Sequence, residues 1–224
     1  MRRVKSLLLI LIIFKSFAIF AHIDRELLES QKCSNIFGHF EKEYDLPKDT
    51  LYAISLQETQ KTHSKHNIWF AWPWTINVGG KGYYFKNKEE AIKFARAKIK
   101  SGKKSIDVGC MQINLKYHAK AFDSLEEAFT PAKNIAYAAK MLKDNHRRFG
   151  SWREAIGRYH SGIKKRAVRY HASVNRIISS IDVYKKHLRD YIIKSQKRNE
   201  EFEPFSIQIS VASYLSGSWF RASA

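Results

Sequence analysis

The chain of 224 residues has few of the residues that mark several broad classes of protein. Its 10 Gly and 4 Pro are too few for a collagen-like or low-complexity architecture. Its 2 Cys lack the C-x-x-C spacing of a structural zinc site. Acidic residues are also scarce, with 21 against 40 basic ones, and this gives a formal charge of +19. After the first 21 residues, no apolar run has the ~20 residues that a membrane span needs.

The composition favours a folded domain that meets anions. Hydrophobic residues make up 44% of the chain and aromatic residues 13%, which excludes a chain that is disordered throughout. The length suits one well-filled domain with a short appendage. The excess of positive charge indicates an anionic partner, either nucleic acid, a membrane surface or an acidic polymer.

The N-terminus has the pattern of a secretory signal peptide. Arg2, Arg3 and Lys5 precede the apolar run of residues 7–14, and Ala18 or Ala21 would end a small-residue cleavage site. An uncleaved anchor is the alternative. We expect a signal peptide over residues 1–21, one folded domain over 22–194 and a C-terminal tail over 195–224. Cleavage removes four positive charges and leaves +15, and export to the periplasm argues against nucleic acid as a partner.

Two cysteines, Cys33 and Cys110, remain after cleavage of the signal. An even number of cysteines in an oxidising compartment suggests a disulfide. Two buried free thiols are the alternative that the sequence leaves open.

Hydrophobic spacing predicts a mainly helical domain with a small β-hairpin. Apolar residues with helical spacing and the stops between them predict helices over residues 26–44, 48–59, 89–100, 130–149 and 174–194. Ser124 and Ser151 each precede a glutamate by three residues, and such capping boxes mark two more helix starts. Alternating aromatic and aliphatic residues around the turn at 79–82 predict the hairpin over residues 72–85.

Glu58 is the carboxylate with the most informative position. It shares one helical face with Leu51, Ile54 and Ser55, so the apolar side of the predicted helix ends at an acid. Burial there would raise its pKa and allow it to act as a general acid near neutral pH. A glutamate that turns into solvent at the helix end is the alternative, and spacing alone favours that alternative.

Four segments in order resemble the lytic transglycosylase domain of the soluble-transglycosylase (SLT), lysozyme-like family. In that family a helix ending in Glu-Ser is followed by G-L-M-Q-I, by N-x-x-x-A-x-x-x-L and by A-Y-N-x-G. The corresponding segments here are 53–59 (AISLQET), 109–113 (GCMQI), 134–142 (NIAYAAKML) and 157–162 (GRYHSG). The resemblance covers about residues 33–180. It implies a lysozyme-like α+β helical domain with an active-site cleft.

The resemblance implies that Glu58 is the single catalytic acid and base. Family members cleave the β-1,4 bond between N-acetylmuramic acid and N-acetylglucosamine in peptidoglycan and form a 1,6-anhydro ring. One glutamate protonates the leaving oxygen and then deprotonates the C6 hydroxyl of the sugar. This differs from the two-carboxylate arrangement of most glycosidases. Asp107 is the nearest rival carboxylate, and a turn aspartate is its simpler interpretation.

The resemblance also implies roles for residues around Glu58. Gln112 would hydrogen-bond the sugars with Met111 packed beneath it, and Tyr159 would place its hydroxyl near Glu58. Asn134 is expected to tie its helix to the cleft. Departures from the family pattern stand at Thr59, which replaces a serine, at Cys110, which replaces a leucine, and at His160, which replaces an asparagine. Thr59 and His160 are assigned to the substrate-binding set, and Cys110 supports a disulfide with Cys33.

Other patterns carry less weight. Trp72, Trp74, Tyr83 and Tyr84 are the candidates for a sugar-stacking platform, but aromatic residues on a hairpin more often form its own small core. His63 and His66 lie close to Glu58 without an H-E-x-x-H pattern, so a polar loop is expected there and no metal. We expect no cofactor.

Three alternatives remain beside the transglycosylase. A hydrolytic muramidase of the same fold is the first, a non-catalytic glycan-binding envelope protein the second, and a basic protein that binds membranes or nucleic acid the third. The expected partners are peptidoglycan strands and the anionic envelope surface. The same active site would serve wall turnover, attack on a competitor, or opening of the wall for a secretion or conjugation machinery.

Overall fold

The computed structural model describes residues 24–200. Residues 24–188 form one compact unit, which contains all the candidate residues named above except the signal peptide and the tail. The predicted signal peptide and residues 201–224 of the predicted tail lie outside the described residues. Within residues 24–200, no helix has both the length and the apolar character needed to cross a bilayer.

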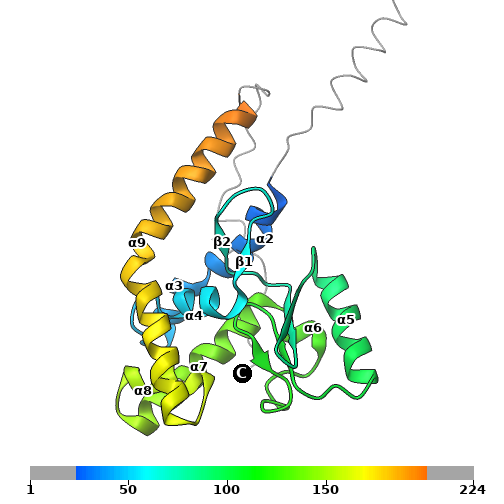
Figure 1. Cartoon of the computed structure of the whole chain (residues 1–224), viewed down its shortest axis with the longest axis vertical. Helices are drawn as coiled ribbons and strands as arrows, with labels where there is room; N and C mark the ends of the chain where they lie inside the picture. Colours follow the sequence, from blue (N-terminus) through cyan, green and yellow to red (C-terminus); the bar gives the residue numbers. More distant parts are fainter. Residues whose placement is uncertain (1–23, 201–224) are drawn as a thin grey trace, which may run out of the picture. The chain divides into compact units, whose positions relative to one another are not determined.

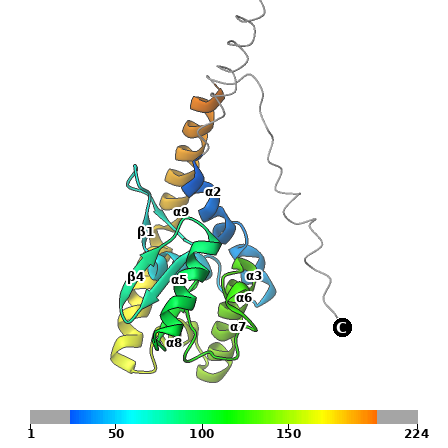
Figure 2. The same cartoon turned by 90° about the vertical axis from the view of Figure 1, so that its right-hand side faces the viewer.

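The fold is mainly helical with two small antiparallel sheets, which confirms the predicted fold class (Figures 1 and 2). The helices are α2 (Arg25–Ser34), α3 (Phe37–Glu43), α4 (Thr50–Thr59), α5 (Lys88–Lys100), α6 (Leu125–Ala128), α7 (Pro131–Phe149), α8 (Trp152–His160) and α9 (Lys164–Glu200). The strands are β1 (Lys61–Thr62), β2 (Trp69–Phe70), β3 (Thr75–Val78), β4 (Lys81–Tyr84), β5 (Ile106–Val108) and β6 (Ile113–Asn114).

The predicted hairpin is the edge of a larger sheet. Strands β3 and β4 pair across the turn at Gly79 and Gly80, which both have positive φ. Strand β5 pairs with the other side of β3, and β6 pairs with β5, so the order is β4-β3-β5-β6. Helix α5 lies beside this sheet (Figures 1 and 2). The sheet therefore joins the hairpin to the segment that carries the GCMQI motif.

The single helix predicted over residues 26–44 is wrong, because the chain forms two helices there. Helix α2 ends at Ser34, and the backbone N–H of Asn35 bonds back to the carbonyls of Cys33 and Gln31. Ser and Asn are poor residues for a helix interior, which the apolar spacing did not take into account. Helix α3 then buries Phe37 and Phe40 in the core.

Helix α4, which carries Glu58, is buried on nearly all sides. Leu51, Ala53, Ile54 and Ser55 have no exposed surface, and Leu56 has 3%. The sequence predicted one apolar face on this helix, but the buried residues lie around nearly its whole circumference. A helix surrounded on all sides needs apolar or small residues around its whole circumference, as α4 has.

The N-terminus of α4 is capped by a side chain from α3. The helix begins at Thr50 rather than at Lys48, after Asp49 with a left-handed backbone. The carboxylate of Glu41 accepts hydrogen bonds from the backbone N–H groups of Asp49 (2.9 Å) and Leu51 (2.8 Å). Glu41 is buried, so tertiary structure supplies the cap that a local residue usually provides.

Other predicted boundaries agree with the structure, except that the last helix, predicted over residues 174–194, is α9 over Lys164–Glu200. The hydroxyls of Ser124 and Ser151 accept hydrogen bonds from the backbone N–H groups of Glu127 and Glu154, as capping boxes require. Pro131 is the first residue of α7, and Gly150 ends it with a positive φ.

Candidate active site

Glu58 lies in the last turn of α4, half-buried, and its carboxylate is held by α9. The hydroxyl of Tyr170 donates a 2.6 Å hydrogen bond to Oε1 of Glu58. Burial and, to a smaller extent, the charge of Asp107 raise the pKa of Glu58, the Tyr170 hydrogen bond lowers it, and together they bring it to about 7. A carboxyl group with this pKa can give up and recover a proton near neutral pH.

Aromatic residues of α8 and α9 surround this carboxylate. Burial and the nearby Glu58 raise the pKa of Tyr170 well above its ordinary value, so its hydroxyl keeps its proton and donates. The ring of His160 stacks on that of Tyr170, with centroids 4.7 Å apart. Burial and, to a smaller extent, the charge of Glu58 raise the pKa of Tyr159, so this second tyrosine lies within electrostatic range of the carboxylate.

The predicted sugar-binding segment is the short link between β5 and β6, and three side chains fix its backbone. Asn134 of α7 accepts a bond from the N–H of Met111 (2.8 Å) and donates to the carbonyl of Val108 (3.0 Å). Ser55 of α4 donates to the carbonyl of Cys110 (2.7 Å), and Tyr159 of α8 donates to that of Met111 (2.6 Å). Elements α4, α7 and α8 thus meet at this link.

A disulfide joins the same link to the first described helix. Cys110 pairs with Cys33 of α2, across 77 residues of sequence, and both side chains are buried. The structure therefore contains the pairing that the sequence suggested.

Two residues of the link have positive φ. Gly109 has φ +81°, and a Cβ placed on it would lie 2.6 Å from Nδ2 of Asn134. Gln112 has φ +48°, which is uncommon for a residue with a side chain. Its Nε2 donates to the carbonyls of Thr75 and Gly109 (both 3.0 Å), which holds the half-buried amide at the surface of the sheet.

Asp107 belongs to the same electrostatic group, although the sequence favoured a turn. It lies in β5, half-buried, and accepts a 2.6 Å bond from Nδ2 of Asn114. Burial raises its pKa, while Asn114 and the charge of His160 lower it. The fold therefore brings a second carboxylate within electrostatic range of Glu58.

The arrangement places a proton-exchanging carboxyl group, two tyrosines and the GCMQI segment around one point of the fold. Comparison with known families shows what part of this arrangement resembles. Residues 83–177 match the family described as Transglycosylase SLT domain. The match confirms the family that the ordered motifs predicted. At the family level it indicates lytic transglycosylase-type activity on peptidoglycan and binding of its glycan strands.

The matched part of the SLT domain contains the GCMQI link, Asn134, Tyr159 and Tyr170. It begins after α4, so Glu58 and Thr59 precede it. No curated protein and no solved structure matched the chain.

Within the SLT domain and the segment before it, several predicted contacts differ from the structure. The hydroxyl of Tyr159 bonds to the carbonyl of Met111 and not to Glu58, so it positions the link. Thr59 is 1% exposed, and its hydroxyl donates to the carbonyls of Ser55 and Phe70. Thr59 was assigned to substrate binding, but burial makes it an anchor between α4 and β2. Met111 lies fully buried in the core, as expected for a residue beneath Gln112.

Three of the four hairpin aromatics pack into the fold rather than form a platform, and only Tyr84 is largely exposed, at 45%. Trp72 and Trp74 are each 3% exposed, and their indole N–H groups donate to Phe85 and Glu29. Tyr83 packs on Phe94, with ring centroids 4.6 Å apart. The alternative of a four-residue sugar platform is therefore wrong, because burial removes both tryptophans from solvent.

Tyr170 is the site residue that sequence reasoning missed. It lies outside the four motifs, and the predicted apolar stripe of the last helix began at Val174. Tyr170 extends that stripe backward by one turn, with Val174, Ile177 and Ile181 at spacings of four, three and four. That spacing was the signal available for it.

The loop histidine His63 bonds to Asp24 (2.9 Å). In the part of the chain that the structure describes, no group of three or more His, Cys, Asp or Glu side chains is arranged to hold a metal ion.

Replacing Tyr170 by Phe should move the pH profile of the enzyme. The lost hydrogen bond lowers the pKa of Glu58 in the wild type, so its removal raises that pKa. With Glu58 as a general acid, the basic limb of kcat/KM should shift upward, because an acid is active below its pKa. The measurement is kcat/KM on solubilised glycan strands between pH 5 and 9. A basic limb that stays in place would show that Tyr170 only packs.

Proposed function

We propose that this protein is a peptidoglycan lytic transglycosylase with Glu58 as its only acid and base. It cleaves the β-1,4 bond between N-acetylmuramic acid and N-acetylglucosamine and leaves a 1,6-anhydromuramic acid end. The observation that carries the proposal is the half-buried Glu58 with a pKa of about 7, oriented by Tyr170. The match of residues 83–177 to the SLT family supports peptidoglycan as the substrate.

In the proposed reaction Glu58 gives up one proton and later takes up another. Glu58 gives its proton to the glycosidic oxygen as the bond to C1 of the muramic acid breaks. The carboxylate then takes the proton of the C6 hydroxyl, and O6 bonds to C1. Glu58 ends protonated, and no water is consumed. A pKa near the working pH suits both halves of this cycle.

Product analysis should show the anhydro form. Purified protein acting on peptidoglycan is expected to release muropeptides that are one water molecule lighter than hydrolytic products and take up no label from heavy-oxygen water. Mass spectrometry of the digest measures both properties. Products with labelled reducing ends would instead establish hydrolysis.

Hydrolysis by a muramidase is the second candidate, and Asp107 is the observation that favours it. A hydrolase that uses two carboxylates needs a second one near the acid, and Asp107 interacts with Glu58 through space. Replacing Asp107 by Asn distinguishes the two reactions. A hydrolase would lose its base and most of its rate, whereas a transglycosylase would still form anhydro products.

The protein is proposed to act in the periplasm on the peptidoglycan of the envelope. The N-terminal pattern of residues 1–21 and the Cys33–Cys110 disulfide both support an oxidising compartment outside the cytoplasm. The net charge, +19 for the full sequence and +15 after the expected cleavage, supports adhesion to the anionic envelope.

A further inference from the structure

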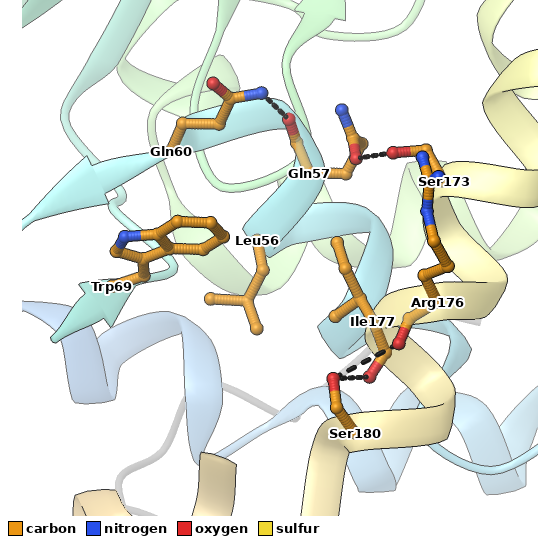
Figure 3. A pocket seen from close by; sticks show the side chains of 8 residues that line it. All are labelled: Leu56, Gln57, Gln60, Trp69, Ser173, Arg176, Ile177 and Ser180. Carbon is orange, nitrogen blue, oxygen red and sulfur yellow. Dashed lines mark hydrogen bonds between the residues drawn. The ribbon is translucent and has the colours of Figure 1, made fainter.

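A pocket of about 370 Å³ lies beside the candidate active site and contains none of the predicted substrate-binding residues (Figure 3). Three elements form it, namely the end of α4, the strand β2 and the face of α9 that follows Tyr170. Its lining residues are Leu56, Gln57, Gln60, Trp69, Ser173, Arg176, Ile177 and Ser180. All eight belong to the compact unit of residues 24–188.

The pocket is held in register with Glu58 by consecutive contacts between α4 and α9. Tyr170 binds Glu58, and one turn further along α9 the hydroxyl of Ser173 donates to Oε1 of Gln57 (2.5 Å). A residue rises about 1.5 Å along a helix, so the pocket begins roughly 5 Å along α9 from the Tyr170 contact. The pocket and the Glu58 contact are therefore built on the same pair of helices.

The two ends of the pocket differ in chemistry. Trp69 is 52% exposed, and its indole lies on one side of Leu56 (Figure 3). Arg176 and Ile177 of α9 lie on the other side (Figure 3). Of the eight lining residues Arg176 alone is charged, and its side chain is exposed. The pocket thus offers an aromatic face, amide groups and one cation.

We propose that this pocket binds the peptide-bearing part of a peptidoglycan strand, with a stem-peptide carboxylate on Arg176 and an apolar sugar face on Trp69. A guanidinium pairs well with a carboxylate, and an indole offers a large apolar face. The proposal rests on the proposed function, because it assigns to that substrate a contact beyond Glu58. It predicts a preference for strands that keep their peptides.

Binding to a catalytically inactive full-length chain tests the preference. Glu58→Gln protein is titrated calorimetrically with soluble glycan fragments of equal length, either with their stem peptides or stripped of them by an amidase. The fragments with peptides are expected to bind roughly three- to fivefold more tightly, the range for an exposed ion pair. Adding Arg176→Ala should abolish this difference.

Two further variants sharpen the result. Lys186→Ala removes an equal charge from an exposed position of α9 outside the pocket, and it should leave the preference unchanged. Trp69→Ala should weaken binding of both fragments several-fold. The Trp69 backbone carbonyl, which accepts a bond from Tyr184 (2.5 Å), stays in place in that variant.

Equal binding of the two fragments by Glu58→Gln protein, or a preference that survives Arg176→Ala, would overturn the proposal. If anionic lipid vesicles abolish the preference for fragments with peptides, and this effect requires Arg176, the pocket binds membranes. That result would overturn the proposal too. The product analysis of the wild type is independent of these measurements. Failure of the proposed reaction and failure of this pocket assignment are therefore distinguishable.

Discussion

Glu58→Gln should lower the rate of glycan cleavage by about a thousandfold, within the range for loss of a general acid and base. Gln keeps the size of the side chain and can still accept the Tyr170 hydrogen bond, but it has no proton to cycle. The rate is measured by chromatography of the released muropeptides. Glu89→Gln is the matched control, because Glu89 is an exposed carboxylate on α5, and its rate should equal that of the wild type.

Stability measurements separate lost chemistry from lost folding in this variant. The pKa of Glu58 is raised from 4.5 to about 7 in the folded protein, so the folded state binds its proton more tightly than the unfolded state. This contribution is present below pH 4.5 and is lost as the pH rises through 7. Gln has no such loss. Glu58→Gln should therefore be at least as stable as the wild type, and more stable above pH 7.

An inactive variant that is also less stable than the wild type at pH 8 would contradict this account. A variant that keeps more than a tenth of the wild-type rate would remove Glu58 from the catalytic role. In that case Glu58→Gln would no longer discriminate the transglycosylase from two of the alternatives, the non-catalytic glycan-binding protein and the basic surface-binding protein.

Gly109→Ala should destabilise the protein by about 3 kcal/mol. A left-handed backbone costs a residue with a Cβ roughly 1–2 kcal/mol, and the new Cβ would lie 2.6 Å from Nδ2 of Asn134. Moving Asn134 breaks buried hydrogen bonds to Met111 and Val108, each worth about 1 kcal/mol. Urea unfolding followed by circular dichroism measures the loss.

The matched control for this variant is Gly38→Ala. Gly38 lies on the exposed side of α3, and a Cβ there would have nothing within 4 Å. Ala in a helix is favoured over Gly, so this variant should be neutral or more stable by up to about 1 kcal/mol. A cost below about 1 kcal/mol for Gly109→Ala would contradict this prediction. It would mean that the link between β5 and β6 can shift without disturbing the hydrogen bonds of Asn134.

The sequence predicted the elements whose signals are local. The capping boxes at Ser124 and Ser151 and the start of α7 at Pro131 need only neighbouring residues, and they agree with the structure. The order of four motifs predicted the family, because each motif contributes to one meeting point of the fold. For Glu58, spacing alone favoured a side chain turned into solvent, and the motif resemblance assigned it to the site; the structure places it half-buried and bonded to Tyr170.

The remaining features depend on contacts between distant segments. Tyr170 reaches Glu58 across 112 residues of sequence, and no local pattern states that such a bond forms. The burial of Trp72 and Trp74 depends on partners in other segments, such as Glu29 of α2. Strands β5 and β6 are too short to show an alternating pattern, and only the pairing of β5 with β3 and of β6 with β5 makes them part of a sheet.

The cap that Glu41 places on α4 has a consequence for motion. Because another helix supplies this cap, α4 cannot fray from its N-terminus without also separating from α3. Its amide protons should then exchange with solvent only when the whole unit opens. Glu58 is thus carried on a helix whose start should be among the last parts of the unit to lose its structure.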